Sequence, residues 1–252
     1  MCAGPVGWMP LKDLFLELCL MFCFRVSAPF VCGPSGGAYN TRPMDIGLLP
    51  LLRENPVAFL LLAASLIGAI GLHEYAHALV ADLQGDRLPR AMGRLTPNPV
   101  RHLDPLGTIL IFLVGFGWGK PVEFRPQALS SRRFGAAMVA LAGPGMNLVL
   151  ALVAAFLYVP LVRSAPSPLT TFLEFFIGIN VLLAVFNLVP LPPLDGSRLL
   201  TIFLPPQRQN VIFFLDRWGF IILLALVFFG GLQLLAPVIN AVGRLMLDIA
   251  GA

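Results

Sequence analysis

The sequence predicts an all-α polytopic membrane protein with about four core transmembrane helices, a re-entrant segment and a small membrane-associated β-strand region. Of its 252 residues, 58% are hydrophobic and 12% are charged, and the mean hydropathy is +0.85. A soluble domain carries about 25% charged residues, so this chain has too little charge to cover a water-facing surface. Four apolar stretches also reach the ~20 residues that a helix needs to cross a bilayer.

The predicted spans follow one another along the chain. They cover residues 57–83, 135–162, 175–194 and 218–243. A fifth apolar run, at 105–119, is rich in glycine and too short to span comfortably as a helix. Such a run is typical of a re-entrant or interfacial segment packed on protein, because irregular backbone at membrane depth must be covered.

The connection between the first two spans is punctuated by proline and glycine, which favours short strands and turns. It also concentrates basic residues, namely Arg87, Arg90, Arg94, Arg101, Lys120, Arg125, Arg132 and Arg133. Because cytoplasmic loops of membrane proteins carry an excess of Lys and Arg, we expect this end of the protein on the cytoplasmic side of the cell membrane. The net charge of +4 then reflects topology, and we expect the lipid bilayer, and no nucleic acid, as a partner.

Residues 1–43 are expected to form an N-terminal extension, and residues 44–252 the transmembrane domain, with its catalytic core at about 57–204. Within the extension, an apolar stretch is interrupted by Asp13 and Glu17. Three interpretations stay open: a weak extra span, a signal-like segment, or sequence upstream of a true start at Met44, which is favoured.

The first span contains the pattern His73-Glu74-Tyr75-Ala76-His77. Two histidines four residues apart lie on one helix face, where both imidazoles can reach one zinc ion at ~2.0–2.1 Å. Glu74 can then take a proton from a water on the metal. The alternative is two ordinary histidines and a solvated glutamate. Burying these groups in an apolar span costs several kcal/mol unless they are paired or bind metal, which favours the zinc site.

A catalytic zinc ion needs a third protein ligand and an open position for water. Asp195 is the candidate, because prolines break the third span before it and Gly196 allows a sharp turn after it. The alternative is an interfacial turn, since Asp-Gly is a common turn pair. Asp195 is expected on the same membrane side as His73 and His77, which favours the ligand interpretation.

Two further polar residues are candidates for substrate or transition-state binding. Asn147 follows Gly143-Pro144-Gly145, which is expected to loosen the second span, and its amide could hold a substrate backbone or an oxyanion. The alternative is a hydrogen bond between helices. His102, the only other histidine, either approaches the zinc site or is an ordinary surface residue, and both interpretations stay open.

Three ordered motifs resemble the site-2 protease family of intramembrane zinc metalloproteases, in its small form without PDZ or CBS domains. The matching residues are His73, Glu74, His77, Gly143, Pro144, Asn147, Asn187, Pro190, Asp195 and Gly196. The resemblance implies one zinc ion per chain, held by His73, His77 and Asp195, with Glu74 as general base. It also implies regulated intramembrane proteolysis, that is, hydrolysis of a membrane-spanning protein or peptide within or near the bilayer.

Two other functions were weighed against this one. Intramembrane His, Glu and Asp also line ion pathways, but the sequence lacks the evident inverted repeats of many transporters. A catalytically inactive relative is the second alternative, and the intact Glu74 argues against it. The sequence indicates neither the substrate nor the oligomeric state.

Overall fold

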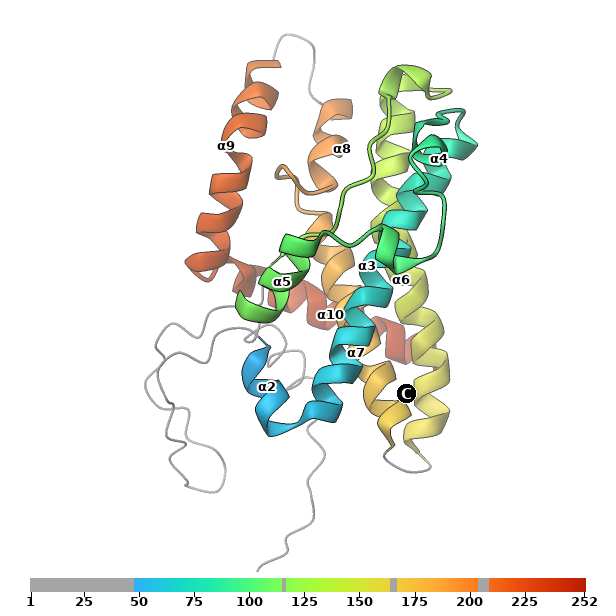
Figure 1. Cartoon of the computed structure of the whole chain (residues 1–252), viewed down its shortest axis with the longest axis vertical. Helices are drawn as coiled ribbons and strands as arrows, with labels where there is room; N and C mark the ends of the chain where they lie inside the picture. The colour runs from blue at the N-terminus through green and yellow to red at the C-terminus, as the bar shows by residue number, and fades with distance from the viewer. Residues whose placement is uncertain (1–47, 115–116, 164–166, 204–208) are drawn as a thin grey trace, which may run out of the picture.

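The computed structural model describes residues 48–114, 117–163, 167–203 and 209–252, which are mainly helical (Figure 1). The N-terminal extension predicted at 1–43 lies outside these residues. A short helix, α2 (Leu49–Glu54), begins the described chain. It leads directly into the first long helix through Asn55, whose side chain accepts a hydrogen bond from the Ala58 N–H at 3.0 Å and so caps that helix.

Four helices among the described residues are long and apolar enough to cross a membrane. They are α3 (Pro56–Leu83), α6 (Arg132–Val162), α7 (Pro168–Asn187) and α9 (Gln209–Phe228). The prediction of a multi-pass helical membrane protein is therefore confirmed. α3 and α7 both begin with proline in the first turn, where the missing N–H costs nothing.

Helices α3, α6 and α7 form a core in which each helix packs against the other two (Figure 1). The α6–α7 contact is built on small residues of α6, and Ala151, Ala154 and Ala155 are all buried there. Small side chains let helix backbones approach closely, which matters in lipid because apolar burial alone does not drive helices together. The buried hydroxyl of Ser65 on α3 adds a hydrogen bond to the Phe172 carbonyl of α7 at 3.5 Å.

The third and fourth spans begin and end earlier than predicted. α7 begins at Pro168 and ends at Asn187, so the proline-rich segment that follows is not part of the helix. α9 ends at Phe228, and Gly230 then adopts a left-handed conformation with φ 77°. The predicted span 218–243 is wrong at both ends, because average hydropathy does not register a glycine turn inside an apolar run.

The chain after this turn forms η4 (Gly231–Leu235) and α10 (Ala236–Ile249). α10 contacts both α6 and α7, and Figure 1 shows it crossing the core helices. Its buried residues Ile239 and Leu247 join the α6–α7 cluster. The last apolar stretch of the chain is therefore a packed helix, distinct from the fourth span.

The β-strand region predicted between the first two spans is wrong for the described residues. Short helical turns stand there instead: α4 (Leu88–Ala91), η1 (Pro99–Arg101) and η2 (Pro126–Ala128). Each has a proline in its first turn, and proline suits the first helical turn while it removes a ladder donor from a strand. The pairing in this part of the described chain is one isolated bridge between Leu103 and Gly119.

Buried aspartates fix this connection to the end of α3. Asp86 is fully buried and accepts hydrogen bonds from the Arg125 backbone N–H at 2.5 Å and from the Arg125 guanidinium at 2.8 Å. Burial raises the pKa of the Asp86 carboxyl, but the hydrogen bonds from Arg125 outweigh it, so the pKa lies below its usual range. Asp82 holds Arg87 and Arg90 in the same way. The irregular connection is thus anchored just beyond the histidine-bearing part of α3.

The glycine-rich run forms α5 (Pro105–Val114), and the chain then returns beside it. A side chain on Gly107 would lie 3.0 Å from the Trp118 backbone nitrogen, so glycine is needed for this close return. Ile111 packs in one cluster with Leu62 of α3 and Ile179 of α7. As expected for this run, α5 packs on protein.

Candidate metal centre

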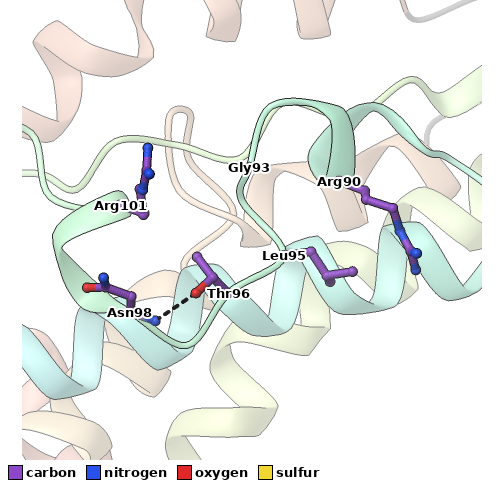
Figure 2. A pocket seen from close by; sticks show the side chains of 6 residues that line it. All are labelled: Arg90, Gly93, Leu95, Thr96, Asn98 and Arg101. Carbon is purple, nitrogen blue, oxygen red and sulfur yellow. Dashed lines mark hydrogen bonds between the residues drawn. The ribbon is translucent and has the colours of Figure 1, made fainter.

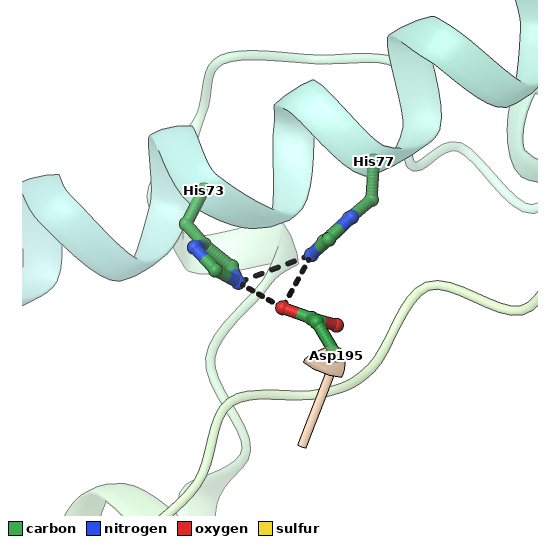
Figure 3. A group of neighbouring side chains, drawn as sticks. All are labelled: His73, His77 and Asp195. Carbon is green, nitrogen blue, oxygen red and sulfur yellow. Dashed lines mark hydrogen bonds and ion pairs between the residues drawn. The ribbon is translucent and has the colours of Figure 1, made fainter. Parts of the chain in front are cut away.

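His73 and His77 lie one turn apart on α3, and both side chains point toward Asp195 (Figure 3). The two Nε2 atoms are 3.0 Å apart. Oδ2 of Asp195 lies 3.1 Å from His73 Nε2 and 3.2 Å from His77 Nε2. The three predicted ligands, which are up to 122 residues apart in the sequence, are thus brought together. Their ligand atoms all lie within 4.8 Å of one another.

Asp195 reaches this position from the segment between α7 and α8 (Gly196–Phe203). A side chain on Gly196 would lie 2.5 Å from the Val189 carbonyl oxygen, so the turn that follows Asp195 requires glycine. The same segment rests on α9, where Leu191 and Leu194 pack against Leu223. The fourth span therefore supports the loop that carries the carboxylate.

Nδ1 of each histidine has a hydrogen-bond partner, which leaves Nε2 free to bind a metal. His77 Nδ1–H donates to the Val139 backbone carbonyl at 2.7 Å, and a carbonyl can only accept. His73 Nδ1–H donates to Oδ1 of Asn147 at 2.5 Å. Such bonds fix the tautomer and the ring orientation of metal-binding histidines.

Gly143 of α6 leaves room beside the two Nε2 atoms. A Cβ added there would lie 2.6 Å from His73 Nε2 and would also collide with Nε2 of His77. The space that this missing side chain leaves, together with two imidazoles and one carboxylate as donors, fits a zinc ion with an open fourth position. The residues present therefore suit the metal that the sequence predicts.

Glu74 projects from the same turn of α3 and is held by a neighbouring segment. The Val122 backbone N–H donates to Glu74 Oε2 at 3.2 Å. A side chain on Gly119 would lie 3.8 Å from Glu74 Oε1. The chain at 119–122 therefore passes close to the carboxylate and orients one of its oxygens.

The structure places the two remaining candidates behind or away from the three ligands. Asn147 is fully buried behind His73, inside a stretch of α6 that stays helical through Gly143-Pro144-Gly145. His102 is also fully buried, and its Nε2 pairs with the Thr96 carbonyl at 2.8 Å. Among the described residues, the metal-binding group consists of His73, His77 and Asp195, without His102.

Comparison with known protein families matches peptidase family M50, the site-2 protease family, over residues 61–164 and 161–226. The chain belongs to this family. The resemblance drawn from the three motifs is thus confirmed, and all three ligand candidates lie inside the matched residues.

Curated relatives agree with this family. The protein named "Putative zinc metalloprotease YwhC" from Bacillus subtilis is 38% identical over 188 residues, covering 71% of this chain and 86% of the relative. The protein named "Putative zinc metalloprotease Rip2" from Mycolicibacterium smegmatis is 32% identical over 175 residues, covering 67% of each chain. No solved structure matches this chain.

A separate hollow of about 550 Å³ lies beside α4 and η1, outside the M50 ligand group (Figure 2). Its lining residues are Arg90, Gly93, Leu95, Thr96, Asn98 and Arg101. The Arg90 guanidinium is paired with Asp82 at 2.7 Å. The hollow is an open polar feature of the connection and shares no residue with the three ligands.

The sequence alone assigned no role to several residues that lie around this candidate site. Val139 and Val122 act through backbone atoms, which side-chain identity does not reveal. Asn180 bonds to Asn147 at 2.7 Å, and the available signal was one of two amides in an apolar span. Gly143 stood in a recognised motif, but its steric role depends on how closely α6 approaches α3.

Proposed function

We propose that this protein is an intramembrane zinc metalloprotease that hydrolyses peptide bonds of membrane-spanning substrates within or near the bilayer. The observation that carries the proposal is the convergence of Asp195 with His73 and His77, which lie on a helix long and apolar enough to span a membrane. Membership in peptidase family M50 and the zinc metalloprotease names of its relatives support it.

We assign His73, His77 and Asp195 as ligands of one zinc ion and Glu74 as the catalytic base. When bound, zinc would polarise the scissile carbonyl and activate a water molecule. Glu74, oriented by the Val122 N–H, takes the proton from the attacking water and returns it to the leaving amine. Asp195 would be the third protein ligand of the ion, which is the number that catalytic zinc sites use.

Asn147 and His102 receive supporting roles in this proposal. Asn147 orients His73, because its amide oxygen accepts the Nδ1 proton. His102 shapes the chain over Glu74, since its backbone carbonyl accepts from the Lys120 N–H at 2.7 Å. Neither side chain is assigned a contact with substrate.

The site is proposed to open toward the cytoplasmic side of the cell membrane. The basic connection between α3 and α6, α8 and the start of α9 lie at one end of the molecule (Figure 1), and Lys and Arg mark cytoplasmic loops. α5, which lies about half-way along the core helices (Figure 1), is proposed to be the re-entrant segment, because it packs on α3 and α7 without crossing the core.

Metal removal tests the proposed function. The protein is reconstituted in liposomes with a pool of single-span peptides, and products are identified by mass spectrometry. We expect cuts within or next to the spanning segments, loss of cutting after zinc chelation, and recovery when zinc is returned. Cutting that persists after chelation, or that falls only in water-exposed tails, would contradict the proposal.

A further inference from the structure

Asn180 is a fully buried amide on α7 that neither the sequence motifs nor the proposed chemistry uses. An unpaired amide in an apolar environment costs several kcal/mol, so its polar atoms need partners. Its Nδ2 donates to the Phe176 carbonyl of the same helix at 2.7 Å. Its Oδ1 accepts from Nδ2 of Asn147 on α6, also at 2.7 Å.

The direction of this chain of hydrogen bonds is set at its far end. The Phe176 carbonyl can only accept, so the Asn180 amide nitrogen must face it and the Asn180 oxygen must face Asn147. The Asn147 nitrogen therefore points to Asn180, and its oxygen points to His73. A flip of either amide would set two donors or two acceptors against each other.

His73 Nδ1 must consequently carry a proton, which it donates to Asn147 Oδ1 at 2.5 Å. The lone pair of a neutral imidazole is then on Nε2, the atom that faces Asp195 and His77. His77 obtains the same arrangement directly from the Val139 carbonyl. His73 obtains it through two amides that cross from α7 through α6 to α3.

We propose that Asn180 is a positioning residue that fixes the tautomer and ring orientation of the zinc ligand His73 through Asn147. The inference rests on the proposed zinc site and extends it to a residue that touches neither metal nor substrate. It also gives a reason for an amide on the buried face of α7, where an apolar residue would pack without needing a partner.

The first test is zinc affinity in Asn180→Leu, which keeps a similar volume and removes both polar atoms. Asn147 then loses the shorter of its two Nδ2 hydrogen bonds and keeps the longer one to the Ala69 carbonyl at 3.5 Å. We expect zinc affinity to fall on the order of 10–100-fold, as for other partners of metal-binding histidines. Affinity is measured by competition with a chromophoric chelator. Ser65→Ala is the matched control: Ser65 is also buried, donates to the carbonyl four residues earlier at 2.8 Å, and lies outside the relay, so its affinity should stay at the wild-type value.

The second readout is the imidazole N–H proton in zinc-loaded protein labelled with ¹⁵N-histidine. The chain contains three histidines, so their signals can be assigned with single variants. We expect the His73 Nδ1–H signal to shift or to exchange with water in Asn180→Leu. The His77 signal should stay in place, since Val139 still accepts its proton. A general loosening of the fold would move both signals.

Wild-type zinc affinity in folded Asn180→Leu, or equal changes at His73 and His77, would overturn the relay. If the leucine variant does not fold, Asn180→Ser replaces it, because the shorter side chain can still donate to Phe176 but no longer reaches Asn147. The same two outcomes then decide. A wild-type protein without zinc would contradict the proposed function itself, so the two failures are distinguishable.

Discussion

Glu74→Gln is expected to abolish most peptide hydrolysis while the protein keeps its zinc. Glutamine has the shape of glutamate and can still accept from the Val122 N–H, but it cannot take a proton from the attacking water. General acid–base groups contribute roughly 10²–10⁴-fold in rate, so we expect a loss of that size. The rate is measured on any peptide that the wild-type protein cuts in liposomes, and zinc content is measured on the same samples.

Glu123→Gln is the control for this change. Glu123 is exposed and follows Val122 directly in the sequence. Its substitution by glutamine therefore removes the same charge close to the site without touching the ligands. We expect wild-type rates from it. A Glu74→Gln protein that cuts peptide as fast as wild type would show that another group transfers the proton.

Gly143→Ala is expected to weaken zinc binding strongly through a single methyl group. That methyl would lie 2.6 Å from His73 Nε2 and collide with His77 Nε2, so both imidazoles would have to turn away from the metal position. We expect zinc affinity to fall on the order of 100-fold or more, at or beyond the upper end seen when groups around metal ligands are altered.

Gly145→Ala is its matched control on the same helix. A side chain at Gly145 meets nothing within 4 Å, while the helix propensity gained is the same at both positions. Zinc affinity should therefore stay at the wild-type value in Gly145→Ala. Equal affinities for the two alanine variants would contradict the placement of the metal beside Gly143.

The first span and the convergence of His73, His77 and Asp195 could be predicted because their signals are local. The spacing of His73 and His77 sets them on one helix face wherever that helix packs. Asp195 was identified from the proline break and glycine turn that surround it. These features depend only on residues that are close in the sequence, so they can be recognised without knowledge of the tertiary structure.

The role of Asn147 depended on tertiary packing and could not be chosen from the sequence. A membrane-buried amide suits either a substrate contact or a helix–helix hydrogen bond. Its amide is oriented by Asn180, 33 residues away, and by the Ala69 carbonyl and the His73 ring on a third helix. The partner of a lone amide is set by helix packing, which hydropathy does not encode.

The predicted strands failed for a different reason. Proline and glycine indicate breaks, and they do so equally for strands and for short helical turns. Pro89, Pro99 and Pro126 each stand in the first turn of a short helix, where their fixed φ is favourable. Gly230 similarly lies inside an apolar run. The turn at this residue ends the fourth span where the hydropathy predicts that the span continues.

The most direct test of the account is the zinc content of purified wild-type protein and of Asp195→Ala, with Glu123→Ala as control. We predict about one zinc ion per chain in wild type and in the control, because three protein ligands hold one catalytic ion. Asp195→Ala should lose most of its zinc while it remains folded. Folded wild-type protein without zinc, or full zinc in Asp195→Ala, would contradict the three-ligand site on which the proposed function rests.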